Sequence, residues 1–376
     1  MSGIEIVNGI VGAVFGILFA TLFQQPLQNV WSTVRRRSAT SLRSLTYRSD
    51  GTVSTWSSFS LGPLHTSALI VEGDGTHPIA PGAMRLQVLE GEVALPDDMA
   101  PWRAEIAAEE ELRGQDPAAG VRIWNGPRYA VESLAVSRTP LDEQPDVLVR
   151  LRPTDYFTFL AAQQLDRRLP DGSTPRARYL DPGDPLSAPA FLQCSFGVNV
   201  AVVTADHLLV VNRRADQVRS GPGLWGASVN EGLSRHIDSA GRHAPDLHDV
   251  ARRGMREELS LESHEYALSL LALVLDVDRR QWSAHFSAHL KDLNGEALRA
   301  RISRGVTDRW EHQSQDYVPF RPADVMEHLL RDDRIHHWAP VAPALFHLAL
   351  VHAHGRGAVE RAEARAVRRA GRTGRS

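Results

Sequence analysis

Two apolar runs separated by a two-residue turn constrain the fold of this chain more than any other feature. Residues 197–204 (GVNVAVVT) and 207–212 (HLLVVN) are rich in β-branched residues and predict a β-hairpin. A helical period follows at 249–261. Strands that alternate with helices in this way favour an α/β domain. Further strand-like runs lie at 268–276 and 282–290, and helical runs at 322–331 and 343–353.

The preceding residues, 62–189, predict a second set of elements, which we interpret as an α+β extension. At 376 residues, the chain is long enough for two such folded units. The many Pro, Gly and Asp residues between 170 and 189 indicate a connecting loop. The expected strands are 68–71, 84–89, 130–136 and 147–151, and the expected helices are 104–112 and 155–169.

An apolar stretch at the N-terminus, residues 4–23, contains only three polar residues. As a helix it would reach roughly 30 Å, one hydrocarbon thickness. Three arginines follow at 35–37, so the positive-inside rule predicts a single-pass transmembrane anchor over 1–31, with the soluble domains in the cytoplasm. Gly12 and Gly16 have the spacing that lets two such helices form a homo-oligomer; the alternative is that they reflect the general frequency of glycine in membrane helices. A cleaved signal peptide and a buried soluble helix are the alternatives.

Two segments are expected to lie outside the main folded regions. Residues 32–61 are interpreted as a linker, and its serine- and threonine-rich part, 38–61, is expected to include a first strand or two. Residues 356–376 carry many arginines without an apolar period, which predicts a disordered tail.

Charge and cysteine content argue against two classes of function. The formal net charge of −3 provides no electrostatic basis for binding nucleic acid. The single cysteine, Cys194, excludes an intramolecular disulfide and a cysteine-based zinc site.

The segment ARRGMREELSL carries the residues most suited to chemistry. On a helix, Arg253, Glu257 and Glu258 fall at i, i+4 and i+5 and can point toward one side. Met255 and Leu259 face the other way, where they would pack on a sheet. Adjacent carboxylates are hard oxygen ligands that suit Mg²⁺ or Mn²⁺. Taken alone, however, a pair of glutamates is more often a solvated face of a helix.

This segment resembles the second half of the Nudix box, in which an arginine, an apolar residue and two glutamates occur in the same register. Upstream, residues 223–232 (GLWGASVNEG) look like the Trp-x-x-Pro-Gly-Gly loop of that family, and the hairpin resembles its opening strands. The resemblance covers about 193–350 and implies a Nudix-like domain at 190–355, with a mixed sheet sandwiched between helices. It also implies a divalent metal, Mg²⁺ or Mn²⁺, held by Glu257 and Glu258.

The sequence departs from the family pattern at three places. Gly254 stands where the family has the first glutamate of the helix, and Ser260 stands where it has a glycine. The loop from 232 to 249 is longer than the usual spacing, so the early glutamate of the box has no single counterpart. Four acidic residues are candidates for it: Glu231, Asp238, Asp246 and Asp249.

The resemblance implies hydrolysis of a nucleoside diphosphate linked to another moiety. Arg253 and Glu311 are the expected catalytic residues, with Glu311 as the base that accepts a proton from water. Arg213 and Arg214 are expected to bind phosphate and Trp225 to stack on a base or sugar. Solvated arginines, an ordinary loop glutamate and a packing tryptophan are the alternatives.

The extension is similar to that of Nudix proteins that act on UDP-sugars. It contains residues 124–129 (WNGPRY), followed by 154–157 (TDYF) and then the hairpin. A nucleotide sugar is therefore the expected substrate.

Two other functions compete with hydrolysis. With Gly254 in place of a carboxylate, the domain would be a nucleotide sensor that binds without cleaving and acts through the membrane helix. A scaffold for protein partners is the third possibility.

Overall fold

The computed structural model describes residues 56–115, 124–139, 144–216, 221–306 and 312–373. All of them belong to one compact unit, Arg48–Ser376. They form a mixed α/β structure, as expected. The predicted anchor at 1–31 and most of the predicted linker at 32–61 lie outside the described residues.

Every helix within the described ranges is too short or too polar to cross a bilayer.

The main sheet has the strand order β13-β8-β7-β12-β11-β3, with β10 also paired to β7 and β9 to β8. The pairing of β7 with β12 is parallel, whereas the other pairings in this sheet are antiparallel. The strands are β3 (Ala68–Glu72), β7 (Phe196–Val203), β8 (Leu208–Arg214), β9 (Trp225–Gly226), β10 (Val229–Gly232), β11 (Tyr266–Asp276), β12 (Gln281–Leu290) and β13 (His312–Pro319). The predicted hairpin and the two strands after the helix are confirmed.

A second sheet has the order β4-β6-β5. Its strands are β4 (Met84–Val88), β5 (Pro127–Arg138) and β6 (Pro145–Asp155), and a short hairpin is formed by β1 (Ser60–Leu61) and β2 (Leu64–His65). The strands expected at 84–89, 130–136 and 147–151 are confirmed, although β5 and β6 are longer than predicted.

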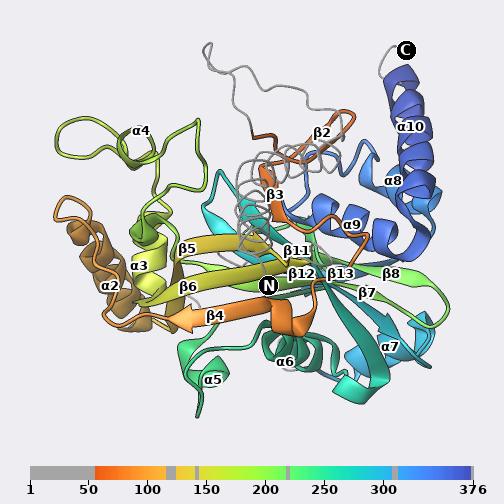
Figure 1. Ribbon diagram of the computed structural model, residues 1–376, viewed down its shortest axis with the longest axis horizontal. Coiled ribbons are helices and arrows are strands. Elements are labelled where there is room, and N and C mark those ends of the chain that lie inside the picture. The colour runs from red at the N-terminus through yellow and green to blue at the C-terminus, as the bar shows by residue number, and fades with distance from the viewer. Residues whose placement is uncertain (1–55, 116–123, 140–143, 217–220, 307–311, 374–376) are drawn as a thin grey trace, which may run out of the picture. The chain divides into compact units, whose positions relative to one another are not determined.

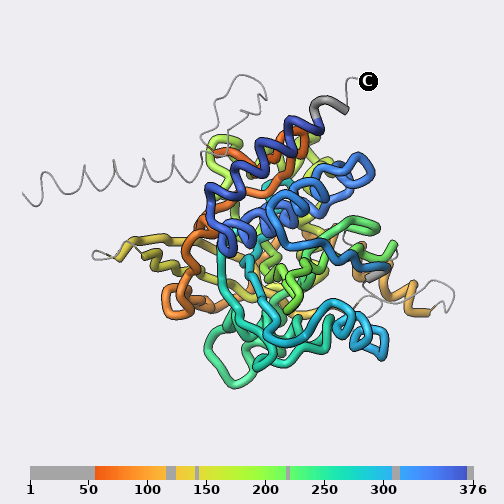
Figure 2. Tube along the Cα trace, turned by 90° about the vertical axis from the view of Figure 1, so that its right-hand side faces the viewer, coloured from red at the N-terminus to blue at the C-terminus, as the bar shows by residue number. Residues whose placement is uncertain are grey.

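The helices lie on both faces of the main sheet. One face packs on α6 through β7 and β10, and the opposite face packs on α9 through β7, β11 and β12. Figure 1 shows α6 and α9 on opposite sides of the strands, and Figure 2 shows the blue C-terminal helices across the sheet from the green-cyan segment that contains α6. The helices are α2 (Ala100–Gln115), α3 (Tyr156–Ala162), α4 (Pro175–Tyr179), α5 (Arg235–Asp238), α6 (Leu247–Leu259), α7 (Gly295–Ser303), α8 (Pro322–Leu329), α9 (Ala342–His354) and α10 (Arg356–Thr373).

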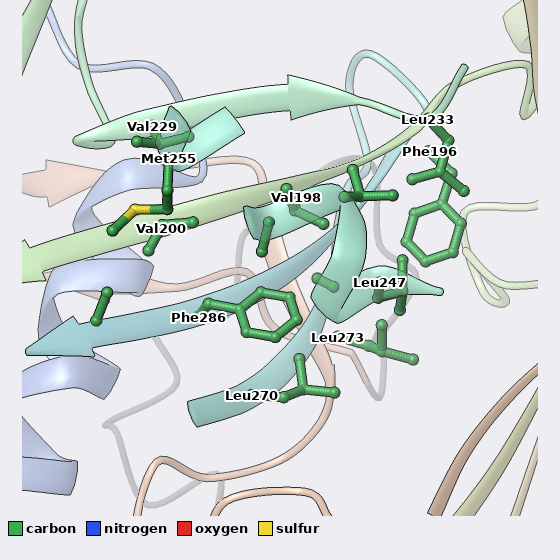
Figure 3. Close-up of a cluster of buried hydrophobic side chains, with 14 of the residues drawn as sticks. Phe196, Val198, Val200, Val229, Leu233, Leu247, Met255, Leu270, Leu273 and Phe286 are labelled. Atoms are coloured by element: carbon green, nitrogen blue, oxygen red, sulfur yellow. The ribbon is translucent and has the colours of Figure 1, made fainter. Parts of the chain in front are cut away.

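The apolar side of α6 is held against the sheet as the helical period predicts. Met255 and Leu259 are fully buried. Figure 3 shows Met255 beside Val229 and Val200, with Phe286 further along the same core. Burial of a side chain of this size contributes roughly 1.5–3 kcal/mol. This packing fixes which side of α6 carries its charged residues.

Local hydrogen bonds define the ends of α6. At its start, the Asp246 carboxylate accepts from the backbone N–H groups of His248 at 2.8 Å and Asp249 at 3.1 Å, as a helix cap does. At its end, Ser260 adopts a left-handed conformation with φ 54°. Glycine is favoured there, so Ser260 holds a backbone position that glycine adopts at lower cost.

The predicted boundary at 189/190 is crossed by strand pairing and by apolar packing. Strand β3 comes from the predicted extension and pairs with β11 of the main sheet. Val147, Val149 and Leu151 of β6 belong to the same apolar cluster as Phe196 and Val198 of β7. The expected extension at 62–189 and the expected domain at 190–355 therefore share this cluster, whereas a second cluster, which includes Met99, Trp102 and Ile106, is formed almost entirely by the extension.

The prediction of a disordered tail at 356–376 is wrong over 356–373, where α10 forms. Its sequence contains several alanines, the strongest helix former, between its arginines. Val359 and Ala362 are buried, and α10 packs against α8 and α9. Arg356 also pairs with Asp74 at 3.0 Å. Packing of a few apolar side chains on α8 and α9 therefore stabilises α10, although its arginine-rich composition predicted a disordered segment.

Candidate functional site

Charged side chains converge where α6 packs against β10 and α5. We call Glu231, Asp238, Glu257 and Glu258 the acidic cluster; the first three contact Arg253. Glu231 lies on β10, Asp238 ends α5, and the other three residues lie on α6.

Arg253 joins three of these carboxylates. Its Nη1 lies 2.9 Å from Glu231 Oε1 and 3.3 Å from Glu257 Oε2. Its Nε and Nη2 donate to the two carboxylate oxygens of Asp238, both at 3.0 Å. Nη2 also donates to the Gly232 carbonyl at 2.9 Å. A planar guanidinium suits this arrangement because it can donate along several directions at once.

Gly254 provides the space for Glu231. A Cβ built on Gly254 would lie 2.9 Å from the Cβ of Glu231 and 2.7 Å from Cγ1 of Val229, which are closer than real Cβ contacts. Glu231 therefore fills the space that a side chain at 254 would need. Position 254 itself carries no carboxylate, and the Glu231 side chain from strand β10 lies beside it instead.

Glu257 and Glu258 do not share one environment. The Glu257 side chain is 27% exposed and pairs with Arg253. Glu258 is buried, and its Oε1 accepts a hydrogen bond from the backbone N–H of Asn230 at 2.9 Å. Glu258 is thus held by β10 rather than solvated, and both glutamates lie at the α6–β10 contact.

The acidic cluster contains more negative than positive charge. Burial raises the pKa of the Glu231 carboxyl to about 8. Arg253 opposes this rise in pKa, while Glu258 and Glu257 add to it by repulsion. Burial acts against the charge of Arg253, but Glu231, Asp238 and Glu257 outweigh it and raise the pKa of Arg253 above its ordinary value. Arg253 therefore stays charged, and a further cation would relieve the excess of carboxylates.

The four acidic candidates for the early box glutamate have different roles. Glu231 and Asp238 belong to the acidic cluster. Asp246 caps α6, and Asp249 pairs with Arg252 at 2.7 Å and with Arg242 at the surface. Only three-dimensional contacts separate these roles, because the long loop from 232 to 249 removes any fixed spacing.

The residues predicted to bind substrate lie on β8 and β9. Arg213 Nε donates to the Gly223 carbonyl at 3.2 Å, and its Nη2 lies 3.9 Å from Asp216. Arg214 ends β8, where it pairs in register with His312. Their role in phosphate binding stays a prediction.

Trp225, which was predicted to stack on a base or sugar, contacts another side chain. The Arg334 guanidinium lies over its ring, 3.9 Å from the centroid. Arg334 is held in turn by Asp316 at 2.6 Å. Arg334 thus covers one face of the Trp225 ring, which favours a packing role for that face over stacking on a base or sugar.

Glu311, the predicted base, lies outside the described residues. Strand β13 begins at the next position.

Within the described ranges, no three His, Cys, Asp or Glu side chains are arranged as a metal site. The oxygen donors of the acidic cluster nevertheless have the chemistry that Mg²⁺ prefers. Glu231 and Glu257 already approach one cationic nitrogen, Arg253 Nη1. The donor type and the negative charge are thus those that a divalent cation requires, whereas the two carboxylates are arranged around Arg253.

Comparison with known proteins gives little further information. No family model and no curated protein matches the chain. Among solved structures, the chain is similar to the crystal structure of DR0079 from Deinococcus radiodurans, at 13% identity, over 36% of this chain and 72% of that chain, with a TM-score of 0.27. A similarity of this size carries no conclusion about fold family or function.

Proposed function

We propose that this chain contains a Nudix-type domain that binds Mg²⁺ or Mn²⁺ at Glu231, Glu257 and Glu258 and hydrolyses a nucleoside diphosphate linked to another moiety, such as a sugar. In this proposal the chain is anchored in the cell membrane by residues 1–31, with its folded unit in the cytoplasm.

The observation that carries the proposal is the convergence of Glu231 and Glu257 on one nitrogen of Arg253, at 2.9 and 3.3 Å. The two carboxylates come from different elements, β10 and α6, which packing holds together. A third carboxylate, Glu258, is buried beside them. Buried carboxylates in excess over cations are costly unless a further positive charge is bound.

The residues of the chain have distinct tasks in this reaction. Arg253 fixes the positions of Glu231 and Glu257, and the Asn230 N–H fixes Glu258. A bound divalent cation would neutralise phosphate charge and lower the pKa of a coordinated water. Arg213 and Arg214 would bind phosphate oxygens, and Glu311 would accept the proton of the attacking water.

The test uses the purified full chain with Mg²⁺ and UDP-glucose or ADP-ribose, and chromatography detects a released nucleoside monophosphate. We expect turnover in the parent and its loss, by about 100-fold or more, in a Glu257→Gln, Glu258→Gln variant, since removing even outer partners of a metal costs about 10–100-fold. Asp249→Asn is the matched control, because Asp249 lies on the same helix but pairs at the surface. Equal turnover in the double variant and the control would show that the metal assignment is wrong.

One observation favours a second function, a sensor that binds a nucleotide without cleaving it. Arg253 already neutralises part of the charge of Glu231 and Glu257, so the acidic cluster is partly satisfied by the protein itself. Calorimetry that finds tight nucleotide binding, together with chromatography that finds no product, would support the sensor over the hydrolase.

A further inference from the structure

We infer that Trp124, His236 and Ile237 form a stacking platform for the aromatic base of the substrate, an inference that rests on the proposed function. These three side chains are called the aromatic platform below.

Exposure and ring geometry identify the aromatic platform. Trp124 is 68% exposed and Ile237 is 58% exposed, which makes them two of the four exposed large hydrophobic residues in the described part of the chain. The rings of Trp124 and His236 are stacked, with centroids 6.4 Å apart and planes 25° from parallel. Folding leaves this apolar ring in water, which costs free energy that a planar ligand would recover.

Helix α5 joins the aromatic platform to the acidic cluster. His236 and Ile237 are exposed on α5, whereas Asp238 of the same helix binds Arg253 with both carboxylate oxygens. Residues two apart on a helix point to different sides, and they are separated by about 3 Å along its axis. The loop after α5 is fastened by a 2.7 Å hydrogen bond between the hydroxyls of Tyr129 and Ser239. Asp238 and Ser239 thus tie the helix that carries His236 to Arg253 and to β5.

A second guanidinium lies beside the same backbone. A Cβ built on Gly232 would come within 2.5 Å of Nη1 of Arg128, so this arginine lies directly against Gly232. The Gly232 carbonyl accepts a hydrogen bond from Arg253. Arg128 is the second residue of β5, four residues after Trp124, and its guanidinium also lies over the Tyr156 ring, 4.7 Å from the centroid. The acidic cluster, the Arg128 guanidinium and the exposed Trp124 ring are thus linked through Gly232, β5 and α5.

This combination of acidic cluster, arginine and exposed aromatic ring suits a nucleoside diphosphate better than a protein partner. Its phosphates need cations, and its base presents a planar face to an aromatic ring. A stable protein partner needs about 800 Å² on each side, far more than three side chains provide. The aromatic platform therefore suits a single ring system.

The experiment measures binding to the full chain by calorimetry, with Mg²⁺ and three probes: UDP-glucose, ADP-ribose and inorganic pyrophosphate. Stacking of one base is worth about tenfold in affinity or more. We expect Trp124→Ala to weaken both nucleotides about tenfold and to leave pyrophosphate unchanged, while Trp124→Phe restores most of the affinity. Leu112→Ala is the matched control, because Leu112 is also exposed, on α2.

The possible results separate the two proposals. A parent chain that binds none of the probes overturns the proposed function, and this inference with it. A parent that binds all three while Trp124→Ala binds nucleotides equally well overturns the aromatic platform alone. Equal weakening of pyrophosphate and nucleotides by Trp124→Ala also overturns it, because that pattern indicates a change in the fold.

Discussion

The two faces of the main sheet bury polar residues in opposite ways. On the α6 face, the acidic cluster contains carboxyl groups that the charged Arg253 side chain contacts at 2.9 to 3.3 Å. On the α9 face, β12 carries Ser283, His285 and Ser287, which are buried and uncharged. Their hydroxyl oxygens and both imidazole nitrogens have no hydrogen-bond partner among the described residues.

The local sequence explains why the second face tolerates these groups. Ser283, His285 and Ser287 alternate along β12, so they share one face. Their register partners on β7 and β11 are mostly small and include Gly197, Ala201 and Ala272, so few side chains compete for the space beside them. Burial lowers the pKa of His285 to about 3, which keeps the imidazole neutral.

In this fold, buried charged groups have a counter-charge, whereas buried neutral polar groups are left without a partner among the described residues. Burying an ion costs several kcal/mol and requires a counter-charge in the same layer, as Arg253 provides. Leaving a neutral hydroxyl or imidazole without a partner costs about 1–3 kcal/mol, which a large apolar core can absorb. The α6 face therefore pairs its buried charges with a counter-charge, whereas β12 on the α9 face buries neutral polar groups without partners among the described residues.

The largest expected effect is the loss of the counter-charge on the α6 face. Arg253→Leu leaves Asp238 and Glu231, whose side chains are only 4% and 17% exposed, and the more exposed Glu257 without their partner, so we expect the free energy of unfolding to fall by about 3–5 kcal/mol. Urea denaturation in metal-free buffer measures it. Arg252→Leu is the control, because the Arg252 side chain is 45% exposed and its pair with Asp249 is worth about 0–1 kcal/mol. Equal losses in the two variants would contradict the role of Arg253.

The next effect is a pH dependence on the α9 face. His285 binds a proton at about pH 6.5 in the unfolded chain but only near pH 3 when folded. Its contribution to stability is therefore complete above pH 6.5 and is lost as the pH falls, by about 1.4 kcal/mol per unit. We expect His285→Phe to gain roughly 2–3 kcal/mol relative to the parent between pH 7 and pH 4.5.

Urea denaturation of parent and variant across this pH range provides the measurement. The comparison of variants is needed because Glu231, with its raised pKa, gives the parent a slope of the opposite sign, in which stability is lost as the pH rises from about 4.5 to 8. His336→Phe, on an exposed turn, is the control and should leave the slope unchanged. Parallel pH profiles of His285→Phe and the parent would mean that His285 is protonated inside the fold.

The smallest effect compares a bonded with an unbonded serine. Ser287→Ala removes a buried hydroxyl without a partner among the described residues, so we expect no loss of stability, or a gain of up to about 1 kcal/mol. Ser228→Ala removes a hydroxyl that accepts from the Val202 N–H at 2.8 Å, and we expect it to cost about 1–3 kcal/mol. Thermal unfolding of both variants measures whether each substitution raises or lowers the stability. A loss in Ser287→Ala that equals the loss in Ser228→Ala would reveal a bound water at β12.

The sequence predicted the elements that have strong periods. Alternating and β-branched runs predicted β7, β8, β11 and β12, and the apolar spacing of Met255 and Leu259 predicted the buried side of α6. These patterns depend on residues that are close in the sequence, so they can be recognised without knowledge of the tertiary structure. The hydrolytic reaction, the metal and the roles of Arg213, Arg214 and Glu311 stay predictions.

Contacts between distant residues could not be predicted. Glu231 was one of four candidates, and its position follows from the missing side chain of Gly254, 23 positions later. The buried polar face of β12 is also a long-range effect, because the alternation of serine and histidine would suit a half-exposed strand until α9 covers it. Likewise, α10 needs α8 and α9 to bury Val359.

The contact between Gly254 and Glu231 also restricts how this site can change during evolution. A chain that first acquires a side chain at 254 forces α6 away from β10, since the new atom would lie 2.7 Å from Val229. A chain that first shortens residue 231 passes through a form with one carboxylate fewer. A substitution at 254 alone therefore costs packing, and one at 231 alone costs a carboxylate of the acidic cluster, so the two positions are expected to change together.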